Sequence, residues 1–95
     1  MRKHGRVDAN QPEIVNGLRK IGATVISTAN IGKGFPDLCV GFRGKNYLIE
    51  IKDGEKPPSA RKLTKDEETF FEYWSGQVYV ANDIYEAIEI IMGTR

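Results

Sequence analysis

The 95-residue sequence contains one cysteine, Cys39, and one histidine, His4. A single cysteine excludes an intramolecular disulfide framework and a cysteine-based zinc site, and a single histidine excludes a histidine-rich metal centre. No apolar run is longer than four residues, whereas a membrane-spanning helix needs about 20. The basic first five residues lead into no apolar stretch, so we expect no secretory signal and a soluble, intracellular protein.

The remaining composition is that of an ordinary globular protein, with 40% hydrophobic and 28% charged residues. These fractions exclude collagen and disfavour disorder or a coiled coil. The length allows one small domain over residues 1–95, with residues 1–7 as a basic arm.

The net charge of +1 conceals an uneven distribution. Residues 1–65 carry thirteen Lys/Arg against six Asp/Glu, and residues 66–95 carry one against seven. This layout allows an anionic partner on one side of the molecule. A chance uneven spread of charged residues over a small surface explains this charge distribution equally well.

The pattern of apolar residues and turn signals predicts the element order αβββαβα. Helical spacing of Gln11, Ile14 and Leu18 indicates a helix over residues 10–21. β-branched and apolar runs predict strands at 24–29, 37–42, 47–52 and 77–81, the middle two forming a hairpin. Capping-box patterns starting at Thr64 and at Asp83 open two further helices, the first ending at Gly76. The strand–helix–strand segment over residues 47–81 predicts a parallel pair, hence an α/β fold with a mixed four-stranded sheet.

The hairpin gathers ionisable side chains on one of its two faces. A symmetric turn within residues 43–46, whether of two or four residues, pairs Cys39 with Glu50 and Asp37 with Lys52. Alternation then separates an apolar core face from a face that carries Asp37, Glu50 and Lys52. Asp37 and Glu50 become diagonal neighbours, about 7–8 Å apart at the backbone.

Two carboxylates at this separation can converge on one hard cation such as Mg²⁺, which takes oxygen ligands. The Ile51 carbonyl could add a third oxygen, and Lys52 could orient or deprotonate a water or neutralise a phosphate. The alternative is a cross-strand ion pair between Asp37 and Lys52, with Glu50 simply nearby. Clustering on a partly buried face favours a functional site.

These residues also resemble a known family. Pro36-Asp37, followed thirteen residues on by Glu50-Ile51-Lys52, is similar to the PD-(D/E)xK nuclease signature. Residues 30–38 and 48–53, with Leu63-Thr64 opening a helix that ends in Trp74, resemble the virus-type replication-repair nuclease (VRR-NUC) branch. The resemblance covers roughly residues 8–81. It implies a restriction-endonuclease-like αβββαβ core flanked by helices, in a stand-alone viral or bacterial protein of a bacterial or virus-infected cell.

The resemblance implies specific roles. Asp37, Glu50 and the Ile51 carbonyl would hold Mg²⁺ or Mn²⁺, and Lys52 would be the catalytic lysine. The family often has a glutamate on its first helix; that position falls on Gln11 here, and Glu13 points away from the apolar stripe. Glu67 occupies a position where the family tends to have glutamine, and it also fits the capping box.

Further residues are candidates for DNA binding. The loop with Asn30 and Gly32 could approach a phosphate, or could be a plain turn. Flanking cations could each neutralise a phosphate, although each could equally be a surface residue; they are Lys33, Lys56, Arg61, Lys62 and Lys65.

The sequence therefore predicts a structure-selective DNA endonuclease dependent on Mg²⁺ or Mn²⁺. Resemblance to small family members implies branched substrates such as four-way (Holliday) junctions and a role in DNA repair. The small size and the aromatic residues of the second long helix favour a homodimer. The alternatives are a non-catalytic nucleic-acid-binding module or nuclease subunit, and a structural protein whose hairpin charges form ion pairs.

Overall fold

Three helices and four strands follow the predicted order αβββαβα. The computed structural model describes residues 8–94, so the expected basic arm over residues 1–7 lies outside the described residues. The elements are α1 (Gln11–Lys20), β1 (Thr24–Ser27), β2 (Leu38–Phe42), β3 (Lys45–Ile51), a 3₁₀ turn η1 (Pro58–Ala60), α2 (Lys65–Tyr73), β4 (Val78–Ala81) and α3 (Ile84–Met92).

The strands form one mixed sheet in the order β1-β2-β3-β4. The pairs β1/β2 and β2/β3 are antiparallel, and β3/β4 is parallel. The predicted mixed sheet and its parallel pair are therefore confirmed. Strand β3 lies between two neighbours, which places the residues at its end in the interior of the sheet.

The hairpin turn is centred one residue earlier than predicted, and the predicted register is therefore wrong by two residues. Arg43 and Gly44 alone form the turn, with φ values of +52° and +81°, as two-residue hairpins of type I′ require. The Arg43 guanidinium lies over the Phe42 ring, 4.9 Å from its centroid. Leu38 consequently pairs with Ile49. Because a shift of two residues preserves the alternation of side chains, the predicted faces remain correct.

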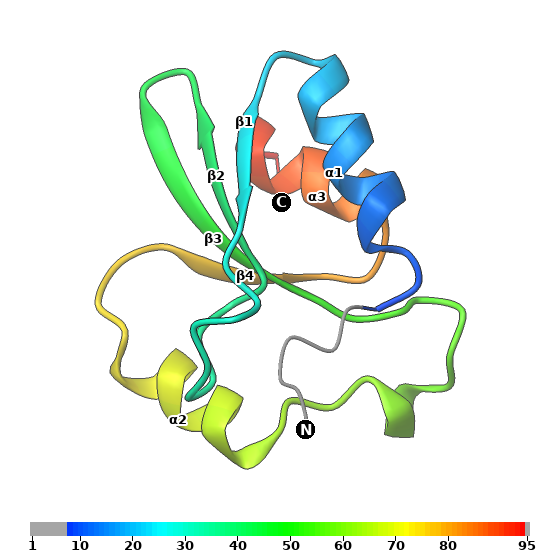
Figure 1. Ribbon diagram of the computed structural model, residues 1–95, viewed down its shortest axis with the longest axis vertical. Coiled ribbons are helices and arrows are strands. Elements are labelled where there is room, and N and C mark those ends of the chain that lie inside the picture. Colours follow the sequence, from blue (N-terminus) through cyan, green and yellow to red (C-terminus); the bar gives the residue numbers. More distant parts are fainter. Residues whose placement is uncertain (1–7, 95) are drawn as a thin grey trace.

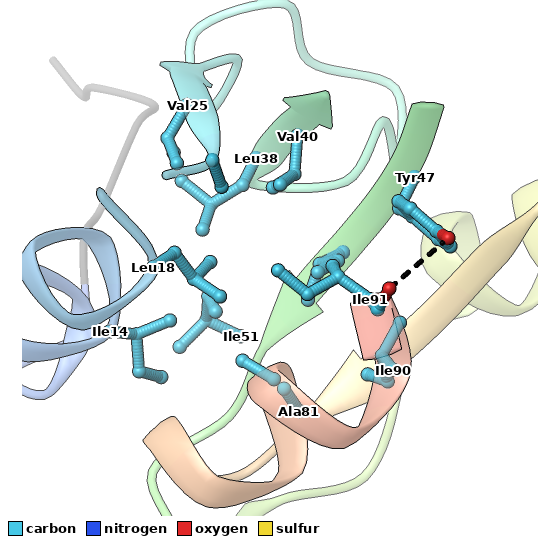
Figure 2. Close-up of a cluster of buried hydrophobic side chains, with 13 residues drawn as sticks. Ile14, Leu18, Val25, Leu38, Val40, Tyr47, Ile51, Ala81, Ile90 and Ile91 are labelled. Atoms are coloured by element: carbon cyan, nitrogen blue, oxygen red, sulfur yellow. Dashed lines mark hydrogen bonds between the residues drawn. The ribbon is translucent and has the colours of Figure 1, made fainter. Parts of the chain in front are cut away.

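The hydrophobic core lies between the sheet and two helices. Figure 1 shows α1 and α3 side by side, and these two helices contact each other. The hairpin contributes Leu38, Val40, Tyr47, Ile49 and Ile51, and the helices contribute Ile14, Leu18, Ala87, Ile90 and Ile91. The Tyr47 hydroxyl donates to the Ile91 carbonyl at 3.4 Å (Figure 2). Burial of this apolar surface is the main contribution to stability.

The helix starts agree with the predicted caps. The Thr64 side chain accepts from the Glu67 N–H while the Glu67 carboxylate accepts from the Thr64 N–H, which completes the capping box of α2. Asp83 accepts from the Glu86 N–H at the start of α3. Helix α2 ends at Tyr73, earlier than the predicted stop at Gly76. Among residues 8–94, no helix is long and apolar enough to cross a membrane.

Candidate functional site

The corrected register places Asp37 level with Glu50. Asp37 lies just before β2, and its backbone carbonyl accepts from the Thr28 N–H at 2.7 Å. Its carboxylate Oδ2 accepts from the Ile51 N–H at 2.8 Å. The sequence predicted Lys52 as the partner of Asp37, and the earlier position of the turn replaces that pairing. Asp37 is thus fixed beside the end of β3 by its backbone and by its side chain.

Glu50 is a carboxyl group inside the sheet, with only 3% of its surface exposed. Its strand neighbour on β4 is Val80. Burial raises the pKa of Glu50 to about 10, and the nearby Asp37 charge contributes in the same direction. Burial also raises the pKa of Asp37, although its hydrogen bond from Ile51 opposes the shift. These two acids favour their protonated forms unless a cation compensates the negative charge.

The Lys52 ammonium group contacts the carboxylates of both Glu50 and Glu67. Its Nζ lies 3.6 Å from the Glu50 carboxylate and 2.8 Å from Glu67 Oε1. Burial by itself lowers the pKa of Lys52, but the hydrogen bond and the charge of Glu67 outweigh it, so the pKa is raised. Lys52 is therefore held as an ammonium group, which favours charge neutralisation over proton abstraction.

Glu67 takes part in both the capping box and the candidate site, the two roles that the sequence left open for it. Its Oε1 accepts from the Thr64 N–H at 2.9 Å within the capping box, and the same oxygen contacts Lys52. Burial tends to raise the pKa of Glu67, but the hydrogen bond from Lys52 prevails and lowers it. Because the cap fixes Glu67, the start of α2 positions the ammonium group of Lys52.

The donor set of the site suits a magnesium-like ion. A buried and a half-buried carboxylate need a counter-charge, and Lys52 already contacts Glu67 more closely than Glu50. Asp37, Glu50 and the Ile51 carbonyl supply oxygen atoms, and Mg²⁺ usually keeps several waters beside one or two carboxylates. Within residues 8–94, no group of three or more His, Cys, Asp or Glu side chains forms a metal-binding cluster. Water would therefore complete the coordination.

The first helix presents Gln11 inward and Glu13 outward, as its spacing predicted. Gln11 is 5% exposed, and its Oε1 has no hydrogen-bond partner among the described residues. Glu13 is exposed. The sequence interpretation missed Asp8, which precedes α1 and is close enough for its charge to raise the pKa values of Asp37 and Lys52. The sequence feature that could have indicated Asp8 is its position as an acidic residue just before the first helix.

Two further positioning residues were also missed. The Asn10 side chain donates to the Lys52 carbonyl at 3.1 Å and to the Asn82 carbonyl at 3.0 Å, which ties the start of α1 to the ends of β3 and β4. The Thr28 hydroxyl donates to the Pro36 carbonyl at 2.7 Å, beside Asp37. From the sequence, Asn10 could be identified only as the residue at which the first helix starts. No local pattern indicates its partners, which lie 42 and 72 residues away along the chain.

The loop before Asp37 packs against the start of α2, so it is more than a plain turn. A side chain at Gly34 (φ +79°) would collide with the Asp66 carbonyl. Asn30 and Lys33 in this loop are exposed. Gly32 and Lys33 also have positive φ, of +83° and +57°.

The predicted DNA-binding cations lie around the loop after β3 and at the start of α2. Lys56, Lys62 and Lys65 are exposed, and Arg61 donates to the Lys56 carbonyl at 2.8 Å. Lys65 also borders a shallow groove of about 550 Å³ on α2, away from the carboxylates. The cation that the structure brings into contact with the acidic site is Lys52.

Comparisons of this chain with family models, with curated proteins and with solved structures found no match.

Proposed function

We propose that this chain is a metal-dependent endonuclease that hydrolyses phosphodiester bonds in DNA. The observation that supports it most is the placement of two adjacent acids, the half-buried Asp37 and the buried Glu50, beside Lys52. Burying paired carboxyl groups costs stability, so a purely structural role gives no reason to retain them. The resemblance of residues 8–81 to the VRR-NUC family agrees with this chemistry.

Each residue of the site has a definable role. Asp37, Glu50 and the Ile51 carbonyl would hold Mg²⁺ or Mn²⁺, which when bound supplies an activated water and neutralises charge on the phosphate. Glu50 gives up its proton when the cation binds. Lys52 stabilises the negative charge that develops on the phosphate, because Glu67 keeps its ammonium group charged and oriented.

We propose that the substrate is branched DNA and that the enzyme acts on it as a homodimer. One site on a chain of 95 residues cleaves one strand per encounter, and a two-fold dimer presents two sites in opposite orientation. Helix α2 exposes Tyr73, of which 79% is accessible to solvent. Exposed aromatic side chains are typical of interfaces. Sedimentation as a monomer at micromolar concentrations would count against the dimer.

The test is cleavage of labelled duplex, single-stranded, flap and four-way-junction DNA in Mg²⁺, Mn²⁺ and EDTA. We expect metal-dependent cleavage that falls about 100-fold or more in Lys52→Ala, as for the loss of a group that stabilises transition-state charge. Lys20→Ala is the matched control, because this exposed lysine in the last turn of α1 belongs to neither the candidate site nor the candidate DNA-binding cations. Equal cleavage by wild type and Lys52→Ala would refute the proposed role of the site.

A non-catalytic nucleic-acid-binding module is the second candidate. Its supporting observation is the basic first two thirds of the chain, where residues 1–65 carry thirteen Lys/Arg against six Asp/Glu. Such a module would bind the junction in a salt-sensitive way and would cleave nothing in any metal. Alanine at Lys52 would then leave binding nearly unchanged.

A further inference from the structure

A groove of about 470 Å³ opens on the same face of the hairpin as the carboxylates. Its lining residues are Cys39, Asn46, Leu48, Trp74, Gly76 and Gln77. Cys39 follows Asp37 by two residues, and Leu48 precedes Glu50 by two. Two residues along a strand span about 6.6–6.8 Å, so the groove begins immediately beside the candidate metal site.

The aromatic wall of this groove is Trp74. Its ring stacks on Phe70 with centroids 4.9 Å apart and an 18° angle between planes, and it meets the edge of Phe35 at 6.2 Å. These contacts fix the indole while 43% of the residue stays exposed. A fixed, partly open indole is suited to stacking on a flat aromatic ligand.

The polar groups of the groove are two primary amides. Asn46 and Gln77 are both exposed, and each amide offers a donor and an acceptor side by side. The hydrogen-bonding edges of nucleobases present the same kind of pattern. Cys39 and Leu48 add apolar surface, and no acidic side chain is among the lining residues. The groove therefore has no charge that would repel nucleic acid.

We propose that this groove binds one unpaired nucleobase of the substrate, adjacent to the scissile phosphate that Lys52 would contact. The inference rests on the proposed nuclease function and specifies its substrate class. A base inside a continuous duplex is stacked on both sides and must be extruded at a cost before it can enter such a groove. DNA with an unpaired base at a flap, bulge or junction is already free of that cost, and would be preferred.

The experiment uses Trp74 as its own reporter, because it is the only tryptophan of the chain. DNA carrying a single-base bulge, the same DNA with an abasic site at the bulge, and continuous duplex are titrated in EDTA, where no cleavage occurs. We expect the bulged base to quench tryptophan fluorescence and to raise affinity about tenfold over the abasic DNA, which is within the range for one stacked base. Equal affinity and no quenching would overturn the proposal.

Variants separate the groove from general DNA binding. In Trp74→Leu, the preference for the bulged base over the abasic site should fall to less than about twofold. Tyr85→Ala is the matched control, since this exposed tyrosine of α3 does not line the groove and should retain the preference. Gln77→Ala and Asn46→Ala change exposed residues, so each tests the amides without disturbing the aromatic cluster. An unchanged preference in all three groove variants would overturn the proposal.

The outcomes also separate this proposal from the nuclease itself. If no DNA is cleaved in metal but the bulge preference depends on Trp74, the groove stands and the nuclease fails. If cleavage depends on Lys52 but not on the bulged base, the nuclease stands and the groove fails. If a second copy covers the groove instead, tryptophan fluorescence will change with protein concentration rather than with the base, which also refutes the proposal.

Discussion

Glu50 is the side chain on which the candidate site depends most. Its carboxyl group is 3% exposed and lies beside a second acid, Asp37, whose pKa burial also raises. Lys52 lies 3.6 Å away, but its closer contact is Glu67. Without a bound cation, the folded protein therefore favours a protonated Glu50, whereas the unfolded chain ionises it near its ordinary pKa of 4.5. A site built to hold a cation is expected to be destabilising when empty.

This predicts that Glu50→Gln stabilises the metal-free protein. Because the pKa of Glu50 rises on folding to about 10, its unfavourable contribution is absent below pH 4.5 and grows as pH rises toward 10. Urea unfolding in EDTA should show a gain on the order of 1–2 kcal/mol at pH 8 and a smaller gain at pH 5. Glu55→Gln, at an exposed position, is the control. A loss of stability at pH 8 would contradict the assigned pKa direction.

Helix α2 links a local capping motif to the site. Thr64 accepts from the Glu67 N–H at 3.2 Å, and the carboxylate of Glu67 contacts Lys52. The loop before Asp37 packs on the same first turn through Gly34. Fraying of this turn would therefore disturb both the partner of Lys52 and the segment that leads into the site.

Thr64→Ala should test that link. We expect a loss of about 1 kcal/mol in the free energy of unfolding, as for other N-cap removals, together with lower metal-dependent cleavage. Thr69→Ala lies on the exposed part of the same helix and should change neither quantity by much. Lower stability with unchanged cleavage would show that the cap is structural only.

The whole molecule places its stable core on one side of the sheet and the candidate site on the other. Helices α1 and α3 cover the core face (Figure 1). The opposite face carries Glu50 and the groove beside Trp74. Metal binding at the site should therefore be coupled to global stability, since the unfolded chain cannot hold Asp37 and Glu50 together.

We accordingly predict that Mg²⁺ raises the melting temperature of the wild type. At a concentration of about 100 times Kd, binding contributes about 2.7 kcal/mol. The shift should shrink at pH 6, because Glu50 must lose a proton on binding, and it should vanish in Asp37→Asn. Glu13→Gln on the outer face of α1 should behave as the wild type. If Glu13→Gln alone abolished the shift, the ligand set would be wrong.

The sequence by itself determined the order of elements, the mixed sheet, the capping box at Thr64 and the two faces of the hairpin. Each of these follows from local spacing or from period-two alternation, which needs no information about distant contacts. The same alternation placed Asp37, Glu50 and Lys52 on one face, so the candidate site could be identified from the sequence alone.

The tertiary structure alone decided the register and the environment of that site. The turn closes at Arg43 and Gly44, one residue earlier than the centre predicted from the sequence, and this position puts Asp37 level with Glu50 instead of Lys52. Contacts between segments distant in sequence brought Glu67 to Lys52 and Asn10 to the end of β3. Burial then determined which carboxyl groups keep their protons, because desolvation depends on every element packed around them.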